Sequence, residues 1–351
     1  MKVLVTGSRG YIGSVLVRML LERDHAVVGL DSDLFAECTF VDSVPEVKTH
    51  LVDCRDAGEE VFDEIDAVIH LAGLSNDPLG DYRPGLTKKI NEDASVRLAA
   101  MAKKRGVKRF LYASSCSTYG AAGEEFLDER STFNPVTPYG ESKVNVEKRV
   151  SVMADDTFSP TFLRASTAYG LSPRIRFDLV TNNLTAWACT TGQVYLKSDG
   201  SAWRPIVHVE DIALAYIAVL EEKRSVVHNQ AFNVGQTSEN YRISEIAKLV
   251  HEIVPGCEVA FAPEASADKR CYRVDCNKIV RTLHGYKPQW TARRGIEQLY
   301  DAYSRTDLTL EQFEGSQFKR IAHIRSLIDR GVLDEDLRRN EPVTNEEEKS
   351  A

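Results

Sequence analysis

The sequence predicts an α/β protein with a doubly wound parallel sheet and a smaller C-terminal α/β lobe. Three observations lead to this prediction. Short apolar runs alternate with segments of helical periodicity in the first half of the chain, a glycine-rich loop follows the first apolar run, and the alternation becomes irregular after about Thr167. Apolar runs joined by amphipathic helices are typical of parallel strands with crossover helices.

The individual elements follow from the spacing of apolar residues. Lys2–Val5 is expected to be a buried strand, Ile12, Val15 and Leu16 then recur at helical spacing, and Ala26–Leu30 is expected to be the second strand. Further strands are expected at Thr49–Val52, Ala67–Leu71, Arg109–Ser114 and Thr161–Leu163, and further helices at Gly85–Lys104, Gly140–Met153, Val209–Leu220 and Ser244–Ile253.

The pattern divides the chain into four parts. Residues 1–167 carry the regular alternation and form the first domain, and residues 168–305 form the smaller lobe, from which the chain can cross back to the sheet. Residues 306–339 have the pattern of an amphipathic helical extension, and residues 340–351, with consecutive glutamates, are expected to be a flexible tail.

Composition narrows the classes of function. The chain of 351 residues has a formal net charge of -8, so it lacks the basic field that binds nucleic acid or an anionic membrane surface. No apolar run reaches the length of a membrane span or resembles a signal peptide, so we expect a cytoplasmic protein. The 7 cysteines are scattered without C-x-x-C spacing, which favours reduced thiols and no metal site.

The glycine-rich loop Thr6–Gly13 stands between the first strand and the first helix. Such a loop is typical of the phosphate-binding turn of a Rossmann-type dinucleotide domain, in which the helix N-terminus faces the phosphate charge. Asp31 ends the second strand, where a carboxylate accepts hydrogen bonds from the adenosine ribose and repels a 2′-phosphate. The loop and Asp31 therefore predict NAD as the cofactor. In this prediction Gly7 permits the tight turn, Gly10 lets the backbone approach the pyrophosphate, and Gly13 lets the helix pack against the strand.

Tyr139 and Lys143 are four residues apart in a predicted helix, so their side chains share a face. A lysine ammonium beside a phenol favours the phenolate form, which can take a proton from a hydroxyl group while hydride leaves the same carbon. A surface helix pair is the alternative. The preceding strand ends in Ser114–Gly120, a hydroxyl-rich segment at the carboxyl edge of the sheet, where ligands bind in this fold class.

Together these motifs resemble the extended short-chain dehydrogenases/reductases, specifically their NAD-dependent nucleotide-sugar epimerases and dehydratases. The resemblance runs from residue 1 to about residue 300. Besides the segments above, it is carried by Asp53, His70–Gly73, Asn91, Arg204–Asp211, Phe232–Gly235 and Arg273.

The resemblance implies a nucleotide-diphosphate sugar as substrate and assigns roles to residues. By resemblance, Ser115 bonds the reacting sugar hydroxyl beside Tyr139, and Arg204 and Arg273 grip the diphosphate. The cofactor-binding residues are expected to be Gly7, Gly10, Tyr11, Ile12, Gly13, Asp31, Asp53, Cys54, Leu71, Ala72, Gly73, Asn91, Ser114, Tyr139 and Lys143. The substrate-binding residues are expected to be Ser115, Ser117, Thr167, Arg204 and Arg273.

Three departures from the family pattern bear on the reaction. Cys116 and Ser117 stand where the 4,6-dehydratases typically have an Asp-Glu pair and the decarboxylases a glutamate, so the carboxylates of elimination are missing. Thr167 stands where the family usually has an asparagine that contacts the diphosphate. Cys116 has two interpretations. It is either an acid or base whose thiol has a shifted pKa, or a residue that only packs in the core.

These features favour an enzyme that oxidises and re-reduces one carbon, which is C4 epimerisation through a transient 4-keto sugar. A dehydratase, or a keto-reductase or dehydrogenase of the same family, is the enzymatic alternative. A non-catalytic protein that senses NAD is the alternative of another class, because fold alone does not give activity.

A homodimer is expected by the same resemblance. The segment Gly85–Lys104 and the helix that carries Tyr139 correspond to the two helices that related enzymes pack into a four-helix interface. The candidates for apolar surface on these helices are Val96, Ala100, Val144 and Val150.

Overall fold

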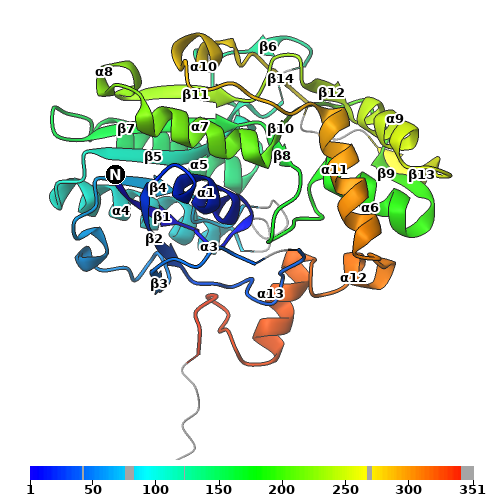
Figure 1. The fold of residues 1–351 in the computed structure, drawn as a ribbon, viewed down its shortest axis with the longest axis horizontal. Helices are drawn as coiled ribbons and strands as arrows, with labels where there is room; N and C mark the ends of the chain where they lie inside the picture. The colour runs from blue at the N-terminus through cyan, green and yellow to red at the C-terminus, as the bar shows by residue number, and fades with distance from the viewer. Residues whose placement is uncertain (42, 76–82, 122, 267–270, 341–351) are drawn as a thin grey trace, which may run out of the picture.

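A seven-stranded parallel sheet forms the centre of the molecule (Figure 1). The computed structural model describes residues 1–41, 43–75, 83–121, 123–266 and 271–340. The strand order is β11-β7-β5-β4-β1-β2-β3, so the order reverses beside β1, the kind of position at which doubly wound sheets bind ligands. The strands are β1 Lys2–Thr6, β2 Ala26–Asp31, β3 Thr49–Leu51, β4 Ala67–His70, β5 Arg109–Ser115, β7 Ser159–Ala165 and β11 Gln230–Val234.

Helices cover both faces of this sheet, which explains why its strands are apolar on both sides. Val3 and Val5 belong to one buried cluster, together with α1 (Tyr11–Leu21) and α7 (Val209–Glu221). Leu4, between them, belongs to a second cluster with α4 (Ala94–Lys104) and α5 (Pro138–Ser151). Successive residues of a strand point to opposite faces, so both cores are packed from the same strands.

Smaller elements complete the lobe beside the sheet (Figure 1). Its strands are β8 Thr167–Tyr169, β10 Trp203–His208 and β12 Asn240–Arg242 in one sheet, and the pairs β9 Gln193–Ser198 with β13 Glu258–Ser266 and β6 Phe126–Leu127 with β14 Arg273–Val274. The other helices of this part of the chain are α6 Val180–Thr191, α8 Arg224–Val227, α9 Ile243–Ile253, α10 Asn277–Thr282 and α11 Ala292–Arg305. Earlier in the chain stand the short helix α3 Pro84–Thr87 and 3-10 turns at Glu59–Phe62 and Cys116–Tyr119.

The predicted strands of the large sheet are all present, with ends displaced by one or two residues. The largest displacement is β7, which extends beyond the predicted Thr161–Leu163 because Arg164 is buried in the strand, in an ion pair with Glu147. The seventh strand, β11, lies between residues 168 and 305, so the chain does cross back from the smaller lobe to the sheet. None of the described helices is long and apolar enough to cross a membrane.

The predicted helix Gly85–Lys104 is interrupted. Between α3 and α4 the chain forms a π-helical segment, Lys88–Asp93, whose wider turn carries Asn91. Asn91 is buried, and its amide bonds both backbone groups of Leu74, at 2.7 Å and 2.9 Å. The π segment therefore holds the loop after β4 in place. Such segments are frequently found at functional sites.

The segment 306–339, predicted to be an amphipathic helical extension, is helical in part. Two short helices stand there, α12 (Leu310–Glu314) and α13 (Arg320–Asp329). The first ends at Gly315, whose backbone is extended, and the second ends before Gly331, which has a left-handed φ of 69°. Residues 330–340 form a turn instead, and of the predicted tail only Asn340 lies within the described residues.

The residues proposed for a dimer face are mostly accounted for within one subunit. Val96, Val144 and Val150 are buried in the single chain, at 8%, 5% and 0% exposure, whereas Ala100 is exposed. Core packing therefore explains three of the four, and the dimer remains a prediction.

Candidate active site

A cavity of about 830 Å³ opens at the carboxyl edge of the sheet and continues into the smaller lobe. It brings together most of the residues that the sequence assigned to a site. Those lining it are Gly7, Gly10, Tyr11, Ile12, Gly13, Asp31, Asp53, Cys54, Leu71, Ala72, Gly73, Ser114, Ser115, Ser117, Tyr139, Lys143, Thr167 and Arg204.

The glycine loop forms one wall of this cavity. Gly7 has a left-handed φ of 70°, and a side chain at Gly13 would place its Cβ 2.0 Å from the carbonyl oxygen of Gly7. Helix α1 begins next to the cavity with Gly10 as its N-cap and no side chain capping its first turn. Uncapped amides and the positive end of the helix dipole are a ready binding site for a phosphate group, so the loop fits the pyrophosphate of a dinucleotide.

Asp31 lies at the end of β2 with its carboxylate held in place. Its two oxygens accept hydrogen bonds from the backbone amides of Arg9 and Asp33, at 2.9 Å and 2.7 Å. Burial raises the pKa of Asp31 above its ordinary value, although these hydrogen bonds oppose the rise. The side chain of Arg9 pairs with Asp33 at 3.0 Å, so the loop's basic residue is engaged by a neighbouring carboxylate. Asp31 is thus oriented to receive ribose hydroxyls.

The loops after β3 and β4 supply the next part of the wall. Asp53 lines the cavity, but Arg55 bonds both of its oxygens, at 2.9 Å and 2.6 Å. Burial raises the pKa of Asp53, but the hydrogen bonds from Arg55 outweigh this effect and hold the pKa below its usual range. Asn91 is outside the cavity lining and supports the loop at Leu74 from behind. Its action on the cofactor site is therefore indirect, unlike the contact that the resemblance implied.

The reactive residues meet at the ends of β5 and α5. Lys143 is 5% exposed, and its Nζ donates to the carbonyl oxygen of Ala113 at 2.6 Å and lies 5.4 Å from the ring centre of Tyr139. Burial lowers the pKa of Lys143 to about 7, which the Glu147 carboxylate opposes. Ser115 Oγ accepts from the backbone amide and the hydroxyl of Ser117, at 3.1 Å and 2.9 Å. Ser115, Tyr139 and Lys143 therefore line the same cavity as the glycine loop.

Cys116 is placed as a packing residue. Its side chain is fully buried, lies outside the cavity lining, and donates to the carbonyl oxygen of Arg164 at 3.1 Å. Burial raises the pKa of the thiol to about 12, so it holds its proton at neutral pH. These observations favour the packing interpretation of Cys116 over that of an acid or base. Ser115, the last residue of β5, lines the cavity, whereas Cys116 begins the 3-10 turn that follows and is buried.

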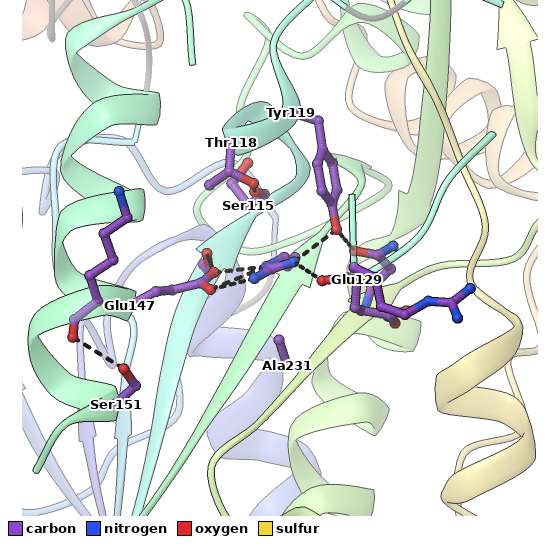
Figure 2. Close-up of polar contacts among 12 residues, drawn as sticks. Ser115, Thr118, Tyr119, Glu129, Glu147, Ser151 and Ala231 are labelled. Carbon is purple, nitrogen blue, oxygen red and sulfur yellow. Dashed lines mark hydrogen bonds and ion pairs between the residues drawn. The ribbon is translucent and has the colours of Figure 1, made fainter. Parts of the chain in front are cut away.

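A buried polar network supports this strand end from behind (Figure 2). Arg164 pairs with Glu147 at 2.6 Å and donates to the hydroxyl of Tyr119 at 3.0 Å. Glu147 also accepts a hydrogen bond from Ser114, next to Ser115. Figure 2 shows Glu147 and Tyr119 on opposite sides of this network. Since Glu147 is one helical turn beyond Lys143, the network fixes the lysine helix against β5 and β7.

The two arginines assigned to the diphosphate lie in different places. Arg204 is 6% exposed and lines the cavity, with Nη1 donating to the carbonyl oxygen of Trp203 at 3.0 Å. Arg273 is outside the lining, with its guanidinium 3.9 Å and 4.4 Å from the ring centres of Phe126 and Trp203. The structure thus brings only Arg204 to the site.

Comparison with known proteins identifies the family. The model of the NAD dependent epimerase/dehydratase family matches residues 3–235. The chain belongs to this family. It is therefore an NAD-dependent nucleotide-sugar epimerase/dehydratase, and membership of an enzyme family counts against the non-catalytic alternative.

Relatives of this epimerase/dehydratase include proteins named UDP-glucose 4-epimerase. That of Bacillus subtilis (strain 168) is 29% identical over 334 residues, covering 85% of this chain and 94% of its own. That of Lactobacillus helveticus is 30% identical over 311 residues, covering 82% of this chain and 92% of its own. Among solved structures, that of MoeE5 with UDP-glucuronic acid and NAD has a TM-score of 0.76 at 25% identity, covering 87% of this chain and 100% of its own.

Sequence reasoning missed several cavity residues of this epimerase/dehydratase. Arg176 and Asp178 line the cavity as an ion pair of 2.6 Å, and Arg176 also donates to the hydroxyl of Ser75 at 3.1 Å. The sequence offered one local signal for this pair, namely that Arg176 and Asp178 stand two residues apart just before a helix. Arg320 and Leu337, from the C-terminal segment, also line it, and no local pattern links them to residues near the start of the chain.

Proposed function

We propose that this enzyme interconverts the C4 epimers of a nucleotide-diphosphate hexose through a transient 4-keto sugar. The observation that carries the proposal is that Ser115, Tyr139 and Lys143 line one cavity with the dinucleotide loop, while Cys116 is buried away from it. The segment Ser114–Gly120 offers no carboxylate for eliminating water. Oxidation and re-reduction at one carbon need a hydride acceptor, which NAD would supply, and a group that takes and returns a proton, which Tyr139 would supply.

The residues divide the work between binding and proton transfer. Arg204 and the amides at the start of α1 meet the negative charge of the two diphosphates. Ser115 and Tyr139 hold the C4 hydroxyl, and the phenolate of Tyr139 takes its proton and later returns it. Lys143, with its pKa lowered to about 7 by burial, can exchange a proton near neutral pH and favours the phenolate while charged. Held by the glycine loop, NAD would supply a reversible acceptor for the hydride that leaves C4.

One observation favours a second candidate, a dehydratase. Asp178 brings a carboxylate to the same cavity from the segment before α6, and a carboxylate there could serve elimination. The same carboxylate is paired with Arg176 at 2.6 Å.

An isotope experiment tests the proposal against this rival. The enzyme is given UDP-hexoses deuterated at C4, in ordinary and in heavy water, and products are separated and analysed by mass spectrometry and NMR. We expect a mixture of C4 epimers with deuterium retained at C4 and no solvent hydrogen gained at carbon. Deuterium at C6 with solvent hydrogen at C5 would establish the dehydratase instead, and consumption of added NADH with a keto-sugar would establish a reductase.

We further propose a homodimer formed through the α4 and α5 helices, by analogy with related enzymes. Ala100 on α4 is exposed, and Val152, directly after α5, is 81% exposed. Light scattering at micromolar concentration should give twice the subunit mass of 39.2 kDa, and a single-subunit mass would exclude the dimer.

A further inference from the structure

The C-terminal segment folds back onto the end of the cavity that contains Asp31. Residues 332–340 form a closed turn, in which Asp334 donates to the carbonyl of Arg338 at 2.9 Å and Asn340 donates to that of Val332 at 3.1 Å. Leu333 and Arg339 form an antiparallel bridge across it. We call residues 330–340 the strap.

Leu337 stands at the tip of the strap and lines the cavity. It is 3% exposed and has a left-handed φ of 59°, a conformation that is rare for a leucine and costs free energy. Its side chain belongs to the same buried cluster as Leu333 and as Leu327 of α13. A strained backbone persists only where the surroundings hold it, so the tip is firmly placed.

The strap is anchored on the loops that follow β2 and β3. Arg339 donates to the carbonyl oxygens of Ser32 and Asp33, at 3.2 Å and 2.9 Å. Arg338 forms an ion pair with Asp56, in the loop after Asp53. These anchors lie within a few residues of Asp31 and Asp53, the carboxylates at the adenosine end of the cavity.

Helix α13 reinforces the same wall. Arg320 lines the cavity, and its guanidinium lies 4.0 Å from the ring centre of Phe35. His323 Nε2 lies 3.1 Å from the carbonyl oxygen of Leu34, and both Leu34 and Phe35 line the cavity. The loop after Asp31 is therefore held between the glycine loop and the C-terminal segment.

We propose that the strap is part of the cofactor site: Leu337 forms an apolar wall against the adenine of NAD, and this contact slows the release of NAD. An aromatic base needs apolar contact on its faces, which Leu337, Leu34 and Phe35 supply. The proposal rests on placing the adenosine beside Asp31, and it does not depend on which sugar reacts. It gives the enzyme a slowly released cofactor, which suits a reaction that returns NAD to its starting state in each cycle.

The test measures NAD release from the full chain. Leu337→Ala and Leu333→Ala are purified, and the dissociation rate of bound NAD is measured after dilution into excess competing ADP-ribose, alongside thermal unfolding. Leu333 is the matched control, because it is a leucine of the same strap, 2% exposed, that lies outside the cavity lining. We expect release about ten-fold faster in Leu337→Ala than in Leu333→Ala.

Two further variants separate an effect on NAD release from a general loss of folding. Leu337→Met keeps an apolar wall and should release NAD near the wild-type rate, whereas Arg339→Gln, which loosens the anchor at Asp33, should accelerate release. Equal release rates in folded Leu337→Ala and Leu333→Ala would overturn the proposal. Because the readout is bound NAD and not sugar turnover, that result would leave the epimerase proposal standing.

Discussion

The two ends of the cavity are built by different means. At the adenosine end, backbone conformation and short motifs prevail: Gly7 and Gly13 shape the turn, and two backbone amides orient Asp31. At the sugar end, side chains from distant segments converge, with Arg176 before α6 and Arg204 on β10. The glycine turn of the first end recurs in Rossmann-type dinucleotide domains, while the second end has to differ with each substrate. The comparison teaches that cofactor choice is readable from local sequence, and substrate choice is not.

Tyr139→Phe removes the group that joins the two ends, and we expect the largest effect from it. Turnover should fall by at least about 100-fold, the usual contribution of a general acid or base, while NAD binding and thermal unfolding stay at wild-type values. Tyr119→Phe is the matched control, since that hydroxyl bonds Asn233 in the buried network and lies outside the cavity lining. Wild-type turnover in Tyr139→Phe would refute the catalytic assignment.

Asp31→Ala tests whether the adenosine end selects the cofactor. We expect NAD affinity to fall by about 10- to 100-fold, as for loss of charged hydrogen bonds, with a smaller loss for NADP because a 2′-phosphate no longer meets a carboxylate. Titration with both cofactors gives the ratio. Asp53→Asn should leave that ratio unchanged, because Arg55 already bonds both oxygens of Asp53. An equal loss for both cofactors in Asp31→Ala would contradict the assignment.

Lys143→Met tests how the buried lysine between the two ends affects the pH dependence of the free energy of unfolding. Its pKa is about 7 in the folded chain, below the ordinary value of 10.5, so the unfolded chain binds more protons between these values. Stability should therefore rise with pH across this window, by at most about 1.4 kcal/mol per pH unit. Denaturant unfolding at several pH values should show this slope in the wild type and its loss in Lys143→Met. Identical slopes would mean that Lys143 stays charged in the folded protein.

Cys116→Ala should have the smallest effect on activity. Because the thiol is buried outside the cavity, we expect turnover within about two-fold of wild type and a loss of about 1 kcal/mol in the free energy of unfolding. Steady-state kinetics and chemical denaturation check both values. A large loss of turnover with NAD binding intact would restore the catalytic interpretation of Cys116.

Sequence reasoning was most successful where function depends on neighbouring residues. Six strands of the large sheet, the glycine loop and the Tyr139–Lys143 pair are each encoded in a short stretch of sequence, so local patterns revealed them. The end of β7 was missed because a charged Arg164 looks like the end of a strand, and only its partner Glu147 on another element explains its burial. The strap was missed for the same reason. Leu337 becomes a cavity residue through contacts with loops that no local pattern connects to it.

The strap has a consequence for how the protein is made. Arg339 and its bonding partner Ser32 are separated by 307 positions, so one wall of the adenosine pocket is synthesised near the beginning of translation and the other near its end. Domains fold from the N-terminus as the chain leaves the ribosome. The glycine loop and Asp31 can therefore take shape on the nascent chain, but the pocket stays open until the last segment emerges. Proteolysis or premature termination just before residue 330 would leave the proposed catalytic residues in the chain but remove the strap that walls the cofactor pocket.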